Sequence, residues 1–145
     1  MVARPGGHHI DGLVGVAPGG VPDSFSLLVG VMLTDQRREG MGNLYVWPGT
    51  HLTHQEYFRA QGPDAITACD STPPIRLGRA EQVTGTPGDV LLAHYLLAHN
   101  IGGNTSEITR RMVYLRLRHR DHDWRAFLAD VLLDFEPVRV RRPSG

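Results

Sequence analysis

One stretch decides how the chain folds, Gly88-Asp89-Val90-Leu91-Leu92-Ala93-His94-Tyr95-Leu96-Leu97-Ala98-His99. It opens on a turn, and the apolar run from Val90 to Ala93 is typical of a buried strand. A glycine-rich turn after His99 leads to Arg110 and Arg111, where another strand begins on positive charge. A lone histidine after an apolar run is usually a packing or turn residue. The role of His99 therefore depends on what else in the chain reaches it.

A second polar stretch near the amino terminus supplies a His-x-Asp pattern at His9 and Asp11. In an extended segment alternate side chains share a face, so these two side chains point the same way. Two histidines and one carboxylate on one face of a metal leave positions open for other ligands, as in non-haem iron(II) oxygenases. In a jelly roll, His99 can lie beside this pair although it comes 90 positions after His9.

Composition bounds the class of protein. The chain has 145 residues, so we expect one domain over 1–145, with a mobile lead-in at 1–7 and a basic tail at 136–145. Fifteen basic and fifteen acidic residues balance, so neither nucleic acid nor a membrane is expected as a partner. We expect the later arginines, Arg116 included, to be solvated. The single cysteine, Cys69, and the lack of a long apolar run indicate a cytoplasmic protein.

Seventeen glycines and ten prolines between short apolar runs predict many turns and an all-β fold. We expect seven or eight short strands and two small helices, arranged as a β-sandwich or jelly roll. The nearly continuous apolar run at 25–33 predicts a central strand buried on both faces. The other strands are expected at 8–16, 43–47, 81–84, 90–93 and 111–117, the helices at 51–61 with Thr50 as cap and at 124–133, and a loop at 64–77.

The residues from 110 to 117 alternate between the two faces of a strand. Arg110 begins one row and Arg111 the other, so only one of them points inward. Periodicity does not choose between them, because Arg111 shares the more apolar row. The two rows are Arg110, Met112, Tyr114 and Arg116 on one face and Arg111, Val113, Leu115 and Leu117 on the other.

Three blocks in order carry a family resemblance. They are His9-Ile10-Asp11-Gly12, then Gly42-Asn43-Leu44-Tyr45-Val46-Trp47-Pro48-Gly49-Thr50-His51, then Gly88-Asp89 through His99 and Asn104 to Arg110. The chain resembles the phytanoyl-CoA dioxygenase family of iron(II)- and 2-oxoglutarate-dependent oxygenases, whose signature Gly-x-Leu-x-x-x-Pro-Gly-Ser/Thr-His is similar to the middle block. The likeness runs from residue 8 to about 118. It implies a double-stranded β-helix, or jelly roll, of the cupin-like kind.

The resemblance also implies the roles of individual residues. His9, Asp11 and His99 would hold Fe(II), and Arg110, eleven positions after His99, would pair with the distal carboxylate of 2-oxoglutarate. A planar guanidinium suits that task because it binds a carboxylate through two hydrogen bonds. The implied activity is oxidation of a small organic substrate by O2, with release of succinate and CO2. Because Asp11 is retained, a hydroxylase or related oxidase is expected and not a halogenase.

Two alternatives stay open at this point. One is a protein of the same fold that binds metal or 2-oxoglutarate without turnover, and the other is a cupin-like metalloenzyme of another class. Only eight residues precede His9, fewer than the resemblance implies. We therefore expect either that a different loop or another chain, such as a second copy in a homo-oligomer, covers the site, or that the chain is a fragment with an exposed site.

Several further polar and aromatic residues receive structural assignments. We expect His94 to pack or to support the site from behind, and His8 to flank it without binding metal. We expect surface or capping roles for His51 and His54, although their spacing on one helix suits a metal. The remaining assignments are Asn104, Thr105 and Ser106 to a turn, Tyr45 and Trp47 to the core, and Tyr114 to the cavity or the core.

Overall fold

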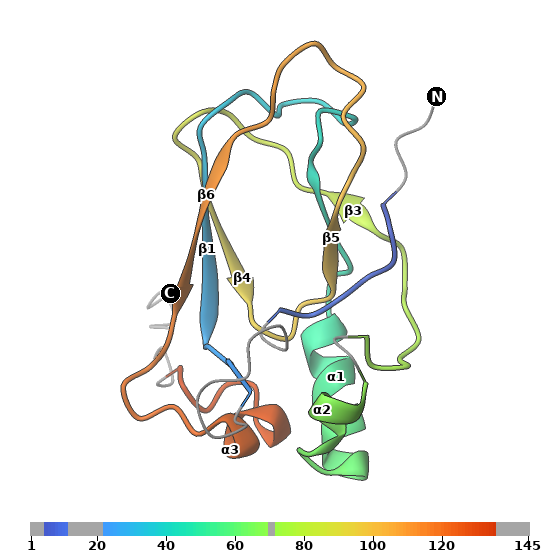
Figure 1. Cartoon of the computed structure of the whole chain (residues 1–145), viewed down its shortest axis with the longest axis vertical. Coiled ribbons are helices and arrows are strands. Elements are labelled where there is room, and N and C mark those ends of the chain that lie inside the picture. Colours follow the sequence, from blue (N-terminus) through green and yellow to red (C-terminus); the bar gives the residue numbers. More distant parts are fainter. Residues whose placement is uncertain (1–4, 12–21, 70–71, 136–145) are drawn as a thin grey trace, which may run out of the picture.

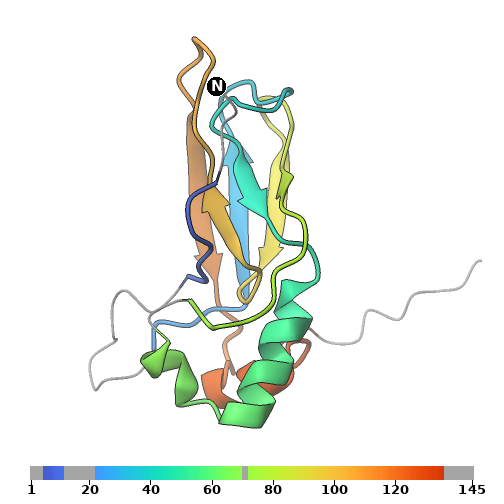
Figure 2. The same ribbon diagram turned by 90° about the vertical axis from the view of Figure 1, so that its right-hand side faces the viewer.

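A computed structural model describes residues 5–11, 22–69 and 72–135, and it consists of two small sheets that face each other with helices at one end (Figures 1 and 2). All strand pairs are antiparallel. The first sheet has the order β4-β1-β6, with β1 at Leu27–Met32, β4 at Val90–His94 and β6 at Met112–Leu117. The second has the order β3-β2-β5, with β2 at Leu44–Val46, β3 at Glu81–Gln82 and β5 at His99–Ile101. The helices are α1 at Thr50–Gln61, α2 at Ala65–Ala68 and α3 at Trp124–Ala129.

Strand β1 is the central strand of its sheet, as the apolar run at 25–33 predicted. Its side chains alternate between buried and half-buried, so the expected burial on both faces holds for one face only. Gly30 lies on the inner face opposite Tyr114. A Cβ at this position would stand 2.9 Å from the Tyr114 ring. The glycine therefore leaves room for the tyrosine between the sheets.

Strand β4 corrects the prediction of a buried strand at 90–93. Val90 and Leu92 are 56% and 63% exposed, whereas Ala93 is buried. The strand lies at the edge of its sheet, and alternation turns every second side chain to the outer face. An apolar run alone does not separate an edge strand with one open face from a strand covered on both.

The helices depart from prediction at three points. Helix α1 begins as expected, but its N-cap is Gly49 with φ 81°, and no side chain caps it. Thr50 instead donates to the Trp47 carbonyl oxygen at 2.7 Å and accepts from the amide of Ala98 at 2.9 Å. Helix α2 lies inside the segment predicted as a loop. Helix α3 ends at Ala129, four residues earlier than predicted, after a start capped by the Asp123 side chain.

The largest cluster of buried apolar side chains lies where the helices meet the sheets. A buried polar cluster lies beside it: the Ser24 hydroxyl is 2.5 Å from Nε2 of His122, whose Nδ1 is 2.5 Å from Oδ2 of Asp134. Ser26 donates to the same carboxylate oxygen. These contacts connect the residues just before β1 with the segment that follows α3. The core cluster comprises Ile10, Phe25, Leu28, Phe58, Ile66, Ala93, Tyr95, Leu96, Phe127, Leu128 and Val131.

The mainly-β class is confirmed, with six strands and three helices in the described ranges where seven or eight strands and two helices were expected. The jelly-roll topology stays a prediction with which the two facing sheets are consistent. Residues 12–16 of the expected first strand and the tail from 136 lie outside the described residues. In the part that is described, no helix has the length and hydropathy to cross a membrane.

Candidate metal centre

Two histidines far apart in the chain are joined by a short backbone bridge. His9 pairs with His99 in antiparallel fashion, and each amide donates to the carbonyl oxygen of the other residue at 3.1 Å. Their imidazole rings lie 4.6 Å apart between centroids. The amino-terminal segment runs along β5 in Figure 1, which is how the beginning of the chain reaches this strand. The bridge brings together the two halves that the sequence separates.

Asp11 completes a group of three side chains that could hold a metal ion. Its Oδ1 atom lies 3.7 Å from Nε2 of His9 and 3.6 Å from Nε2 of His99. One ligand atom from each residue lies within 4.8 Å of the others, and no second such group is found in the described part of the chain. Nδ1 of His99 is 2.8 Å from the Leu97 carbonyl oxygen. That bond fixes Nδ1 as a donor, so Nε2 is the ring nitrogen that faces Asp11.

The charges of the three residues depend on one another. Contact with the His99 imidazole lowers the pKa of Asp11, burial opposes this, and the Arg116 guanidinium adds to the lowering. Burial lowers the pKa of His99, but the contacts with Asp11 and with the Leu97 carbonyl together outweigh burial, so the pKa of His99 is raised. Burial and the neighbouring His99 lower the pKa of His9. Asp11 is thus held as a carboxylate beside two imidazoles, the charge state in which it binds a cation.

The three residues open on a cavity of about 590 Å³ between the two sheets. Apart from them, its walls are mainly apolar, with Tyr114, Asn100 and Arg116 as the polar exceptions. Such a pocket has the size of a site for a small organic molecule. The lining residues are His9, Asp11, Leu28, Leu44, His99, Asn100, Ile101, Tyr114, Leu115 and Arg116.

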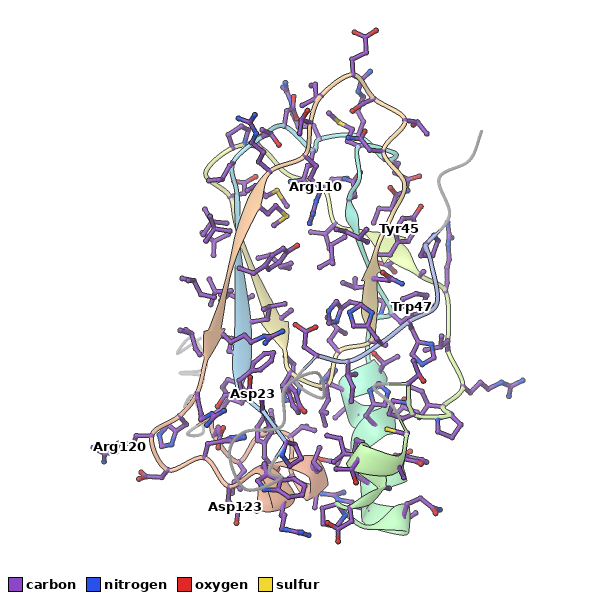
Figure 3. All side chains as sticks on the ribbon, in the orientation of Figure 1. Asp23, Tyr45, Trp47, Arg110, Arg120 and Asp123 are labelled. Carbon is purple, nitrogen blue, oxygen red and sulfur yellow. The ribbon has the colours of Figure 1, made fainter. Side chains whose placement is uncertain are left out.

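Arg110 lies between the sheets, near the end of the molecule opposite the helices (Figure 3). Its Nε donates to Oε1 of Gln36 at 3.1 Å, and its Nη2 donates to the phenolic oxygen of Tyr114 at 2.6 Å. Tyr114 lines the cavity, so Arg110 is connected to it through this contact. Arg111 is exposed. Of the two candidates that periodicity left open, Arg110 is the one on the inner row.

The side-chain amide of Gln36, which lies beside Arg110, has a hydrogen-bond donor that is not used. The side chain is fully buried, and its Oε1 accepts from the Arg110 guanidinium. Its Nε2 has no hydrogen-bond partner among the described residues. A buried amide donor without a partner is uncommon in proteins and calls for an explanation, such as a ligand oxygen. No local pattern singled out this residue, because it lies in a polar turn.

Sequence reasoning also missed that Arg116 lines the cavity. It was grouped with the solvated arginines, but it shares the inner row of Arg110 and lines the cavity. Its Nη2 lies 3.5 Å from Oδ2 of Asp11. The alternation of β6 was the signal that could have found it.

The remaining histidines have structural contacts. His94 stacks on Phe127, and its Nε2 lies 2.8 Å from the Val131 carbonyl oxygen, in keeping with the packing role predicted for it. His54 is fully buried, with Nδ1 2.7 Å from the Leu96 carbonyl oxygen, so its expected surface or capping role is wrong. His8 packs edge-on against Trp47. None of these belongs to the metal-ligating group.

The turn and aromatic assignments agree with the structure. Oδ1 of Asn104 accepts from the amide of Ser106, and its Nδ2 donates to the Ile108 carbonyl oxygen, which closes the predicted turn. Tyr45 and Trp47 are buried, as expected of core residues. Tyr114 lines the cavity.

The sequence model of phytanoyl-CoA dioxygenase (PhyH) matches residues 15–112, more than half of the chain. The chain belongs to the phytanoyl-CoA dioxygenase family. The match includes His99 and Arg110, while His9 and Asp11 lie just before its first residue. No curated protein and no solved structure matches the chain. Phytanoyl-CoA dioxygenases are iron(II)- and 2-oxoglutarate-dependent oxygenases as a class, so this chain is of that kind.

The residues present fit both small partners of the family. Two imidazole nitrogens and one carboxylate oxygen are the donor set of non-haem iron(II) centres, which leaves coordination positions free. The unpartnered donor of Gln36 beside the Arg110 guanidinium fits a carboxylate group. Both observations concern side chains that the fold already holds in place.

Proposed function

We propose that this phytanoyl-CoA dioxygenase family member is an iron(II)- and 2-oxoglutarate-dependent dioxygenase that hydroxylates or otherwise oxidises a small organic substrate. The observation that carries the proposal is the convergence of His9, Asp11 and His99 on one point at the wall of an apolar cavity. Of the open alternatives, a metalloenzyme of another class would not need an arginine held between the sheets beside the unpartnered donor of Gln36.

In this proposal His9, Asp11 and His99 hold the metal. Bound iron and 2-oxoglutarate supply the oxidation, in which one oxygen atom of O2 ends in succinate, with loss of CO2, and the other in the substrate. The Leu97 carbonyl fixes the orientation of the His99 ring, so that Nε2 would be the atom that binds the metal. Asp11 occupies the position that a halide would need, which supports oxygenation of the substrate over halogenation.

Arg110 is the proposed partner of the distal carboxylate of 2-oxoglutarate. Its contacts with Gln36 and Tyr114 hold the guanidinium on the inner side of β6. Nη1 makes no hydrogen bond with the residues that the structure describes, so it is available to an incoming carboxylate. The Nε2 donor of Gln36 would supply a further hydrogen bond. A carboxylate here would thus meet a charge and two or more donors.

The apolar walls of the cavity give the third element of the mechanism. Leu28, Leu44 and Ile101 line it from both sheets. They would place a hydrocarbon portion of the substrate beside the metal and exclude water from it, which strengthens every electrostatic contact inside. The protein's part is to bind and orient two molecules, while iron carries the redox chemistry.

An anaerobic titration tests the proposal. Iron(II) followed by 2-oxoglutarate is expected to produce the weak visible charge-transfer absorption of a chelate in the wild type. Arg110→Ala should weaken 2-oxoglutarate binding by about tenfold or more, since a charge-assisted pair is lost. Arg111→Ala, which removes the exposed neighbour, should bind within twofold of the wild type.

Two outcomes would contradict the assignment: a wild type without the absorption, or an Arg110→Ala protein that binds 2-oxoglutarate as tightly as Arg111→Ala. Succinate release with candidate substrates then separates an enzyme from a protein of the same fold that only binds.

A further inference from the structure

Among the described residues that line the cavity, Asp11 is the only acidic one and Arg116 is the only arginine or lysine. It lies on β6, where its backbone pairs with Leu28 of β1. Beyond the metal-ligating group, its neighbours in the lining are mostly aliphatic. With a divalent metal bound by Asp11, the lining would carry a net positive charge. Such a cavity favours an anionic ligand.

The guanidinium of Arg116 is only loosely engaged by the protein. Its Nη2 lies 3.5 Å from Oδ2 of Asp11, and its Nη1 lies 3.9 Å from Oδ2 of Asp23. Both distances exceed those of charge-assisted hydrogen bonds, which are about 2.7–2.9 Å. Within the described residues it makes no hydrogen bond, although a guanidinium carries five N–H donors.

Neighbouring arginines show what a fully engaged guanidinium looks like in this protein. Arg118 lies 2.8 Å from Oδ1 of Asp23. Arg110 makes its close contacts with Gln36 and Tyr114. Arg116 therefore differs from both, because its donors are left over and its side chain faces the cavity.

Two contacts hold the Arg116 guanidinium where a ligand would meet it. It lies over the Phe25 ring, 5.4 Å from the ring centroid, which restricts the position of its plane. The pairing with Asp11 uses Oδ2, while Oδ1 of the same carboxylate faces the two histidines. The Asp11 carboxylate thus lies between Arg116 and the proposed metal position. The remaining donors of Arg116 would lie beside a ligand bound at that metal.

We propose that Arg116 binds a carboxylate group of a small molecule in this cavity, next to the metal centre. The inference deepens the proposed function and rests on it for the identity of the metal. A planar guanidinium with unused donors selects carboxylates over neutral groups, because it offers two parallel hydrogen bonds together with a charge. The carboxylate belongs either to 2-oxoglutarate, at its metal-binding end, or to the organic substrate. In the second case the substrate class is a small carboxylic acid with an apolar body.

Ligand binding to the protein loaded with Mn(II), which resists oxidation, tests this without turnover. Calorimetry would measure the affinity of the Mn(II)-loaded protein for 2-oxoglutarate. It would then measure the affinities for benzoate and short fatty acids, each with 2-oxoglutarate present and absent. The matching amides, such as benzamide, serve as neutral probes. The variants are Arg116→Gln and, as matched control, Arg118→Gln, which removes an arginine that pairs with Asp23 outside the cavity.

We expect Arg116→Gln to weaken carboxylate binding about tenfold or more and to leave amide binding within twofold. Arg118→Gln should bind both carboxylates and amides with the affinities of the wild type. A loss confined to 2-oxoglutarate would assign Arg116 to the cosubstrate, and a loss in the carboxylate panel would assign it to the substrate. Arg116→Lys, which keeps the charge without the planar fork, should fall between, and it provides the comparison if Arg116→Gln does not fold.

The proposal is overturned if the affinities of Arg116→Gln for both 2-oxoglutarate and the carboxylates stay within twofold of those of Arg118→Gln. It is equally overturned if the wild type binds amides as tightly as carboxylates. Failure of the proposed function has a different signature, since the wild type would then lack the iron(II)–2-oxoglutarate absorption while still preferring carboxylates to amides.

Discussion

Oδ1 of Asp11 lies 3.6 Å from Nε2 of His99, and the opposite ring nitrogen of His99 is occupied by the Leu97 carbonyl oxygen. The carboxylate and the imidazole therefore face each other with the atoms that bind metals. Asp11→Asn keeps the shape of the side chain and removes its charge. We expect this variant to lose about 100-fold or more in affinity for Mn(II) or iron(II), because changes even behind a metal ligand cost 10–100-fold.

Calorimetric metal titration checks this first prediction. Asp121→Asn, which changes an exposed carboxylate paired with Arg120, is the matched control and should bind metal like the wild type. Mn(II) should also raise the melting temperature of the wild type by mass action. An equal rise in Asp11→Asn would show that the metal binds elsewhere.

Gly42 has no Cβ and so leaves room for the side chain of Arg110. Its φ is 75°, and a Cβ there would lie 3.2 Å from Cδ of Arg110. Gly42→Ala is expected to destabilise the fold by roughly 1–2 kcal/mol, from the left-handed backbone, and also to displace the guanidinium. The second effect should weaken 2-oxoglutarate binding several-fold, measured by titration at a temperature where the variant is folded.

Gly49→Ala separates the two effects. Gly49 has a similar φ of 81°, but a Cβ there meets nothing within 4 Å. Gly49→Ala should lose about as much unfolding free energy as Gly42→Ala, measured in urea, and should keep the affinity of the wild type for 2-oxoglutarate. Equal affinities in the two variants would refute the steric role of Gly42.

Buried histidines make the stability of the protein sensitive to acid. Burial lowers the pKa of His54 to about 4, although the Leu96 carbonyl opposes this, and burial likewise lowers the pKa of His94 to about 4. An unfolded histidine takes up its proton near pH 6.5. Between pH 6.5 and 4 the unfolded state therefore binds more protons, so the free energy of unfolding falls as the pH falls. His54 alone contributes on the order of 3 kcal/mol to this loss.

Urea unfolding at pH 7.5 and pH 5 checks the acid sensitivity. In His54→Asn the side-chain amide can still donate to the Leu96 carbonyl but does not titrate, so the difference in unfolding free energy between the two pH values should shrink. His119→Asn, at an exposed histidine, should retain the full difference. An unchanged pH dependence in His54→Asn would contradict the assignment.

Asp134 is expected to matter for stability and not for the metal. Its Oδ2 accepts from both His122 and Ser26, and the side chains of His122 and Asp134 are each only 3% exposed. Asp134→Ala leaves buried donors without an acceptor, which should lower the free energy of unfolding by about 3 kcal/mol.

Asp130→Ala, at an exposed acidic residue nearby, should change stability by far less. Metal affinity, measured below the melting temperature, should be the same in both variants. A loss of metal affinity in Asp134→Ala alone would link the buried cluster to the metal centre.

Local patterns predicted those features that depend on neighbouring residues. Alternation along β6 separated Arg110 from Arg111, and the apolar run at 25–33 gave the central strand β1. Arg116 was expected to be solvated like the arginines that follow it, although the same alternation had placed it in the row of Arg110. The exposed outer face of β4 was missed because a sequence does not say which face of a strand is covered.

Features that depend on distant residues were beyond such patterns. Ser24 and His122 lie far apart in the chain, so no local spacing of residues predicts their contact. The pairing of His9 with His99 was expected only through the family resemblance. Gln36 gave no signal, since its unpartnered donor follows from the position of Arg110 and not from any property of the turn.

The bridge between His9 and His99 has a consequence for the order of folding and metal uptake. Closing a loop of 90 residues opposes folding by about 4 kcal/mol of chain entropy, and two backbone hydrogen bonds, which need no metal, hold that loop closed. A metal that binds there would meet a preorganised site and would not have to gather its ligands from an unfolded chain. The metal-free protein should in consequence be a folded species that loads and releases its ion reversibly, unlike small zinc domains, whose folding and metal binding are a single event.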